Sequence, residues 1–431
     1  MVKTISSLCS FTYKPAEFFP NNVDPNLCTH LTYFTIGHRK ITISTDLPFL
    51  FLLLYHSNDK LGALLAIGGP LLLRFTQMVA SRGTQQTFID SVIVHLRKVA
   101  FDGIYLDFEY LGSRGRPAED KHHFTVLVQE ILEAFTAEAA SSGKLRLLIT
   151  APVFAGKATI DAGYEIAEIG KLLDFISVMT YDFHGGWDTF TGHNSPLHQG
   201  SETGSKFPLK YAMEYWRDNG VPAEKLLMGF PTYGHTFRLT SSDASVGAPA
   251  SGAGSSGPYT REAGFWAFYG VRCFYKLGFS AEVNWIDDQK VPYAYRGNKW
   301  VGFDNICNYK HRVKYLKDNN FGGSIVWAID LDDFLGTFCN EGKYPLINQS
   351  CIPHETTTEA SVATTPSTDG RSTTPAPSSN RVLFWKPDGT YVHPDSHTQF
   401  HMCSHGRRFT FTCSAGLVFD ESCMCCNCPK C

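Results

Sequence analysis

Apolar runs recur along the first 350 residues of this chain of 431, and their order restricts the fold to very few architectures. Seven runs have strand-like character, and amphipathic helical patterns such as those at 85–100 and 124–140 separate several of them. The predicted strands lie at 31–36, 63–69, 102–110, 145–153, 174–182, 225–233 and 323–329. Alternating βα units in this number predict an α/β fold, a closed (β/α)8 TIM barrel rather than an open doubly wound sheet.

The chain divides at a segment that cannot form a core. Residues 351–381 hold many Thr, Ser and Pro and almost no large apolar residue, so we expect a linker between 1–350 and 382–431. Within the larger part, about ninety residues separate the last two predicted strands. This interval is too long for one loop, which predicts a small inserted α+β domain at about 236–300.

Cysteine is concentrated at the end of the chain. Seven of the 13 cysteines lie in the last 29 residues, which predicts a small disulfide-rich β module and an oxidising compartment. The sequon at Asn348 agrees with an extracellular location. Residues 1–8 lack the apolar region and cleavage site of a secretory signal peptide. We therefore expect a secreted protein whose signal peptide is missing from this chain.

Charge and hydropathy argue against two classes of partner. The net charge is −3 and no basic helix face stands out, so we expect no nucleic acid partner. The longest apolar run, at 48–55, is too short to span a bilayer, so we expect no membrane partner. No spacing of His, Cys or carboxylates in the barrel indicates a metal site, and we expect no metal and no cofactor. We expect a monomer.

The predicted strand at 102–110 carries an unusual set of polar side chains. Because side chains alternate along a strand, Tyr105, Asp107 and Glu109 share one face, and the apolar residues between them share the other. In a barrel the apolar face would pack on the helices and the polar face would point inward. Buried carboxylates are costly unless paired or functional, and Glu109 falls at the strand end where barrel active sites lie. The alternative is a structural acid pair.

This segment resembles the D-G-x-D-x-D-x-E signature of the family-18 glycoside hydrolases, of the vertebrate acidic chitinase and chitotriosidase type. Further segments at 64–69, 179–185, 228–234 and 326–333 resemble the same family, and the similarity extends over nearly all of 8–350. The resemblance implies a barrel that acts on chitin and on N-acetylglucosamine oligomers.

The resemblance also implies a role for each matching residue. Glu109 matches the general acid that protonates the glycosidic oxygen, and Asp107 matches the carboxylate that orients the acetamido group of the substrate. Tyr181 matches the phenol that hydrogen-bonds the acetamide oxygen. The residues implied to bind the sugar are Met179, Asp182, Tyr233, Trp327 and Trp187. Without the family context, the buried tyrosines and Trp327 would be read as core residues.

Three positions depart from the family pattern. Tyr105 stands where the family has an aspartate that shares a proton with the residue matching Asp107. A tyrosine cannot take that proton near neutral pH. Lys14 and Pro70 stand where the long cleft of the family carries tryptophans. We therefore expect weakened hydrolysis.

The resemblance extends to the cysteines of the barrel. It implies two disulfides, Cys9–Cys28 and Cys273–Cys339. Cys307 and Cys351 have no assigned partner.

The end of the chain resembles a second family, the peritrophin-type (type-2) chitin-binding domain. Five cysteines of 382–431 fit its spacing of six: Cys403, Cys413, Cys423, Cys425 and Cys426. Trp385 sits near where the first cysteine of the pattern belongs, so we expect one bridge to be absent or rewired through Cys428 or Cys431.

Two functions of different classes follow. One is retaining, substrate-assisted hydrolysis of the β-1,4 linkages of chitin and chitin oligomers in weakened form, because Glu109, Asp107 and Tyr181 are all present. The other is that of a chitinase-like lectin that binds chitin oligomers without cutting them, which the three departures favour. A degenerate gene product that folds poorly is a third reading, based on the odd cysteines and the missing signal peptide.

Overall fold

The structure is a computed structural model, and it contains two compact units, Met1–Ile352 and Pro353–Cys431. The described residues are 3–8, 14–34, 58–69, 75–201, 208–276, 281–338, 341–350, 389–404, 407–412, 418–420 and 425–427. No helix within these ranges is long and apolar enough to cross a membrane.

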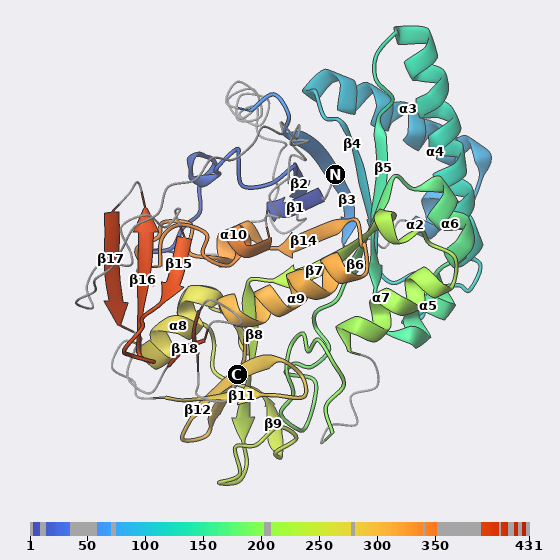
Figure 1. The fold of residues 1–431 in the computed structure, drawn as a ribbon. Helices are drawn as coiled ribbons and strands as arrows, with labels where there is room; N and C mark the ends of the chain where they lie inside the picture. The colour runs from blue at the N-terminus through green and yellow to red at the C-terminus, as the bar shows by residue number, and fades with distance from the viewer. Residues whose placement is uncertain are drawn as a thin grey trace, which may run out of the picture. The chain divides into compact units, whose positions relative to one another are not determined.

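The first unit is built on a closed barrel of eight parallel strands (Figure 1). Its strands are β1 (Lys3–Leu8), β2 (His30–Phe34), β3 (Gly62–Gly69), β4 (Gly103–Phe108), β5 (Leu148–Phe154), β6 (Phe175–Met179), β7 (Leu226–Pro231) and β14 (Gly323–Trp327). Neighbouring strands around the barrel follow the order β1-β14-β7-β6-β5-β4-β3-β2, and β1 pairs with β2 to close it. The predicted fold class is confirmed.

Strand β1 is the one barrel strand that the sequence analysis did not predict. Its residues include Thr4, Ser6 and Ser7, and this hydroxyl-rich composition hides the apolar signal of a strand. The strand is nevertheless buried, because it pairs on both sides: Ile5 lies opposite Ile325 of β14 and opposite His30 of β2. Pairing with both neighbours in the closed barrel therefore stabilises β1 as a strand, which its own composition would not predict.

The two faces of β4 pack as its alternation predicts. Ile104, Leu106 and Phe108 belong to the main core between the strands and the helices. Tyr105 points the other way, into a small cluster inside the barrel. The other buried members of that interior cluster are Ile5, Leu64, Ala66, Phe175, Leu227 and Ile325. Such layers of large side chains fill the interior of a barrel, so its centre is a packed core rather than a channel.

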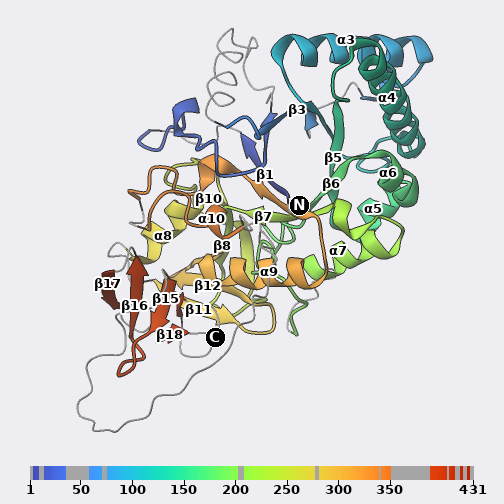
Figure 2. The same cartoon turned by 45° about the horizontal axis from the view of Figure 1, so that its top comes forward.

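Helices cover the outside of the barrel. They are α2 (Phe75–Met78), α3 (Arg82–Val99), α4 (Asp120–Ser142), α5 (Lys157–Gly163), α6 (Ile166–Leu172), α7 (Leu209–Asp218), α9 (Ile306–Asp318) and α10 (Ile347–Ser350), with 3-10 turns η1 (Pro20–Asn22), η2 (Ala223–Lys225) and η3 (Ile329–Leu331). Figures 1 and 2 show α3 to α7 on one side of the strands. Side chains cap the starts of α3 and α9: Ser81 accepts a hydrogen bond from the Thr84 amide at α3, and Asn305 forms a capping box with Asn308 at α9.

An antiparallel sheet with one helix is inserted between β7 and α9. Its elements are β8 (Tyr233–Leu239), β9 (Ala250–Ala253), β10 (Phe265–Ala267), α8 (Phe268–Lys276), β11 (Glu282–Ile286), β12 (Val291–Arg296) and β13 (Lys299–Gly302). The strand order is β10-β8-β13-β12-β11, and β9 pairs with β8. This is the small inserted α+β domain that the long interval predicts.

The second unit is described over 389–404, 407–412, 418–420 and 425–427, and its regular elements in these ranges are β-strands. It has a three-stranded antiparallel sheet of β15 (Gly389–Val392), β16 (Gln399–Ser404) and β17 (Arg407–Thr412), and a two-stranded sheet of β18 (Val418–Asp420) and β19 (Cys425–Asn427). The rings of Phe400 and Phe419 stack with centroids 4.7 Å apart, and Phe419 is buried. An aromatic contact of this kind gives a module of this size an apolar centre.

Candidate active site

The end of strand β4 is held against β3 by a close backbone approach. Asp107 lies opposite Gly68 in the parallel register. A Cβ atom at Gly68 would lie 1.7 Å from the carbonyl oxygen of Asp107, and the φ angle of Gly68 is +133°. Only glycine fits there. Asp107 is 5% exposed, while Glu109, just beyond the strand, is partly exposed.

The two carboxyl groups of this strand compete for a proton. Burial, followed by the charge of Glu109, raises the pKa of Asp107 well above its usual range. Burial also raises the pKa of Glu109, and the charge of Asp182 acts in the same direction. A hydrogen bond between the two carboxyls favours one shared proton, so they titrate as a pair. A carboxyl pair that keeps a proton towards neutral pH can serve as a general acid.

Tyr110 and Arg114 border Glu109, and the sequence analysis did not identify them. The Tyr110 ring stacks on Phe154 with centroids 4.6 Å apart, and the Arg114 guanidinium lies 3.6 Å from the centre of the Tyr110 ring. Burial, followed by the charge of Glu109, raises the pKa of Tyr110 to about 12. The Arg114 charge partly opposes the rise in the pKa of Glu109. The sequence feature that could have identified this pair is the presence of a cation, Arg114, in the loop directly after β4.

A second cluster of polar side chains lies just after β6 and at the start of β8. Tyr233 donates a hydrogen bond to Oδ1 of Asp182 over 2.7 Å, and Nε2 of His235 lies 2.8 Å from the same oxygen. Nδ1 of His235 lies 3.1 Å from the carbonyl oxygen of Gly264. His235 was given no role in the sequence analysis, although it shares the face of Tyr233 two residues along β8. Together with Tyr233, it fixes the position of the Asp182 carboxylate.

The predicted site residues form one connected group. The rings of Tyr181 and Tyr233 have centroids 6.1 Å apart, and the pKa of Tyr181 is raised by burial and by nearby acids that include Asp107 and Glu109. Trp187 is 62% exposed, and its ring lies 5.4 Å from that of His235. A broad indole face left open to solvent beside a polar site is suited to stacking on a sugar ring.

Met179 and Trp327 end the strands β6 and β14, and both are partly exposed. The Trp327 ring packs edge-on against Phe34 with centroids 4.8 Å apart. Residues from β4, β6, β8 and β14 therefore meet at the carboxyl ends of the barrel strands, the end at which barrel enzymes place their sites.

Tyr105 fits inside the barrel without a hydrogen bond to the neighbouring acid. The side chain is 1% exposed, and its ring lies edge-on to Phe34 at 5.7 Å. Burial raises the pKa of its phenol well above the usual range, so the phenol keeps its own proton. Oδ1 of Asp107 has no hydrogen-bond partner among the described residues. The layer below Asp107 is therefore aromatic packing rather than a proton acceptor.

The remaining sequence predictions concern residues at the edge of the described ranges. Lys14 is exposed, and its carbonyl oxygen accepts a hydrogen bond from Arg261 over 3.5 Å. Pro70 lies outside the described residues, as do Cys9 and Cys339. Both barrel disulfides therefore stay predictions, with Cys28 buried and Cys273 partly buried. In the described part of the chain, no cluster of three or more His, Cys, Asp or Glu side chains could hold a metal ion.

A closed parallel barrel with a carboxyl pair at the end of its fourth strand, near the exposed ring of Trp187, has the architecture of a glycoside hydrolase. The chain belongs to the glycosyl hydrolases family 18, which it matches over residues 9–332. Residues 385–431 match the chitin binding Peritrophin-A domain.

Individual relatives include both enzymes and a binding protein. Mouse chitotriosidase-1 is 41% identical over 445 residues, covering 99% of this chain and 95% of its own. The solved structure of human YKL-39, described as a pseudo-chitinase with retained chitooligosaccharide binding, aligns with a TM-score of 0.76 and 40% identity over 81% of this chain and 98% of its own. An immunomodulatory active chitinase from Trichuris suis aligns with a TM-score of 0.76 and 34% identity over 81% of this chain and 99% of its own.

The charge next to Glu109 provides a test of the site's electrostatics. Because the Arg114 cation lowers the pKa of Glu109, the substitution Arg114→Gln should raise that pKa. Carboxyl ¹³C shifts of Glu109, followed across pH, measure this change directly. Arg116→Gln is the matched control, because Arg116 donates to the backbone carbonyl oxygen of Glu109 over 3.5 Å. An unchanged or lower pKa in Arg114→Gln contradicts this account of the site.

Proposed function

We propose that the barrel hydrolyses the β-1,4 linkages of chitin and N-acetylglucosamine oligomers with retention of configuration, at a reduced rate. The observation that carries the proposal is the Asp107–Glu109 pair at the end of β4, where burial raises the pKa of both carboxyls and so favours a retained proton. Membership of a glycoside hydrolase family supports the same reaction class. A two-carboxylate reaction is not required, because in this family the acetamide of the substrate is the nucleophile.

In the first step, Glu109 gives its proton to the glycosidic oxygen while the acetamide oxygen of the sugar attacks the anomeric carbon. The bond to the leaving sugar breaks, and a cyclic oxazolinium ion forms. Asp107 faces the positive nitrogen of this ion, and the Tyr181 phenol donates a hydrogen bond to the acetamide oxygen before attack. These groups fix a geometry in which the reacting atoms are already close.

In the second step, the Glu109 carboxylate removes a proton from a water molecule, which attacks the anomeric carbon on the face the leaving sugar left. The ring of the oxazolinium opens, the acetamide is restored and Glu109 is protonated again. Two inversions at one carbon give net retention. Met179, Asp182, Tyr233, Trp327 and Trp187 hold the sugar in these steps.

The alternative function is that of a lectin that binds chitin oligomers without cutting them. Tyr105 supports it, because an aromatic ring replaces the proton-sharing group beneath Asp107. Human YKL-39, a pseudo-chitinase that retains chitooligosaccharide binding, shows that a relative can bind without hydrolysis. The presence of both Asp107 and Glu109 favours hydrolysis in this chain.

The second unit would hold the protein on its substrate. A match to a chitin-binding domain supports binding to insoluble chitin, and a secreted monomer is the state that we propose for this activity. Linking two binding sites raises retention on a polymer through effective concentration, without a new contact.

The substitution Glu109→Gln should abolish hydrolysis and leave oligomer binding largely intact. An amide keeps the shape of the carboxyl but has no acidic proton, a loss of about two to four decades in rate. Fluorophore release from a chitobioside measures the rate, and calorimetry with chitotetraose measures binding. Turnover equal to that of the parent removes Glu109 from the mechanism.

The substitution Tyr105→Asp should raise kcat by about tenfold or more, because Asp107 would gain a partner with which to share its proton. The loss of the ring from the interior cluster should lower Tm, since it leaves a cavity and buries a polar group. Rate across pH and Tm are measured together. Tyr105→Phe, which keeps the ring, should leave both near the parent values. A folded Tyr105→Asp protein with no gain in rate shows that Tyr105 does not limit catalysis.

Separation of the two units by a protease site placed within 351–381 should leave activity on soluble oligomers unchanged and lower retention on chitin beads. The barrel carries the reacting groups, whereas the second unit adds avidity. Bound and free fractions after washing give the measurement. If the separated barrel stays on beads as well as the whole chain does, the second unit is not a working binder.

A further inference from the structure

A buried segment, residues 193–195, lies directly behind the sugar-binding end of β6. The amide of Asp182 donates to Oδ1 of Asn194 over 2.9 Å, and the amide of Phe183 donates to the carbonyl oxygen of Asn194 over 3.0 Å. Oγ of Ser195 donates to the carbonyl oxygen of Thr180 over 2.5 Å. The segment therefore fixes the backbone on both sides of Tyr181.

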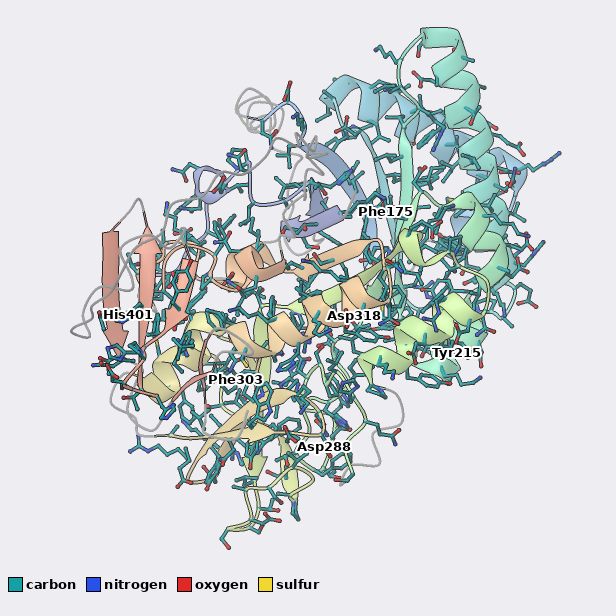
Figure 3. The ribbon with its side chains drawn as sticks, viewed as in Figure 1. Phe175, Tyr215, Asp288, Phe303, Asp318 and His401 are labelled. Atoms are coloured by element: carbon teal, nitrogen blue, oxygen red, sulfur yellow. The ribbon has the colours of Figure 1, made fainter. Side chains whose placement is uncertain are left out.

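The segment is itself held by the stretch of chain that leads from the insertion back to the barrel. Nε2 of His193 lies 2.8 Å from the carbonyl oxygen of Phe303, which Figure 3 labels in the stretch between β13 and α9. The amide of Ser195 donates to Nδ1 of His193 over 2.9 Å. Burial lowers the pKa of His193 to about 3, so the ring is neutral and its partners place the proton on Nε2.

A further contact comes from a fully buried arginine of α9. Nη2 of Arg312 donates to the carbonyl oxygen of Ser195. The same guanidinium makes a two-pronged ion pair with Asp304, with Nη1 to Oδ2 at 2.9 Å and Nη2 to Oδ1 at 2.8 Å. Asn308 donates to Oδ1 of Asp304 over 2.5 Å. Arg312 is 0% and Asp304 2% exposed, so each needs the other's charge.

The geometry of this pair suits positioning better than stabilisation. A buried ion pair seldom makes a protein more stable than apolar side chains of similar volume would. A planar guanidinium held at two points by Asp304, however, presents the second N–H of Nη2 in one fixed direction. That direction is towards Ser195.

We infer that Arg312, oriented by Asp304, is a positioning residue that sets Tyr181 and Asp182 through segment 193–195. The inference rests on the proposed function, because it concerns the residues that would hold the acetamido group. Arg312 touches no substrate; it acts through Ser195, Asn194 and the backbone of residues 180–183, which follow β6.

Loss of this contact should affect the transition state more than substrate binding. The attack of the acetamide oxygen requires a closely defined position of the Tyr181 phenol, whereas ground-state affinity also draws on the unaffected rings of Trp187 and Trp327. A change in kcat with little change in KM is therefore the signature of positioning.

The test uses the full chain with both charges of the pair removed, as Asp304→Asn with Arg312→Met. This double variant avoids leaving one buried charge unpaired, and an asparagine at 304 can still accept from Asn308. The matched control is Arg146→Met with Asp174→Asn, a two-pronged pair that precedes β5 and β6 at the opposite end of the barrel. Arg312→Lys is a second variant that keeps the charge but lacks the fork.

In the Asp304→Asn/Arg312→Met protein, kcat on a chitobioside should fall about tenfold, equal to about 1.4 kcal/mol, with KM within threefold of the parent. Arg312→Lys should show a smaller fall, and the control should keep kcat within twofold. A kcat for either Arg312 variant equal to that of the parent overturns the inference.

A second readout does not depend on hydrolysis. With fluorotyrosine incorporated, the ¹⁹F signal of Tyr181 is assigned by comparison with Tyr181→Phe. In the Arg312 variants this signal should change its chemical shift or at least double its linewidth, and in the control it should stay unchanged. If the parent does not cleave the chitobioside, the proposed function fails and this signal alone decides the inference. An unchanged Tyr181 signal then overturns it.

Discussion

Two carboxyl groups two residues apart on a buried strand cannot both be charged at low cost, and the site depends on how this chain resolves that conflict. Closure of the barrel leaves Asp107 almost without solvent, and Gly68 brings the backbone of β3 up to it. A lone proton shared with Glu109 removes most of the repulsion. The same arrangement that relieves the strand also stores the proton that acid catalysis needs. A single shared proton therefore lowers the cost of burying the two carboxyls and also meets the requirement of the proposed general acid.

Much of the fold was predictable because it repeats a local pattern. Seven barrel strands and the insertion follow from apolar runs and their spacing, and alternation alone placed Tyr105 inside and Leu106 outside the barrel. Strand β1 was not predictable in this way, because its burial depends on partners more than 300 residues away in β14. Its own hydroxyl-rich composition gives no such signal.

The residues of the candidate site likewise fall into those that the sequence could identify and those that only the structure reveals. Glu109, Asp107 and Tyr181 lie in segments that resemble a family, and the structure brings them together. His235 and Arg312 were missed, because their contacts join positions 53 and 117 residues apart that no periodicity connects. A sequence pattern can identify the groups that react, but the groups that orient them are defined by the tertiary structure. The role of Tyr105 also needed the structure, which shows the ring accommodated among apolar neighbours rather than crowding them out.

The insertion shares an element with the site. Strand β8 begins at Tyr233, a residue of the candidate site, and continues as the strand to which β9, β10 and β13 pair. Asp304 and Arg312 anchor the other end of the insertion, where the chain returns to the barrel. The inserted domain is therefore not an exchangeable appendage: a recombination event that swapped it between relatives would replace Tyr233 and His235, and with them both hydrogen-bond partners that this strand supplies to Asp182.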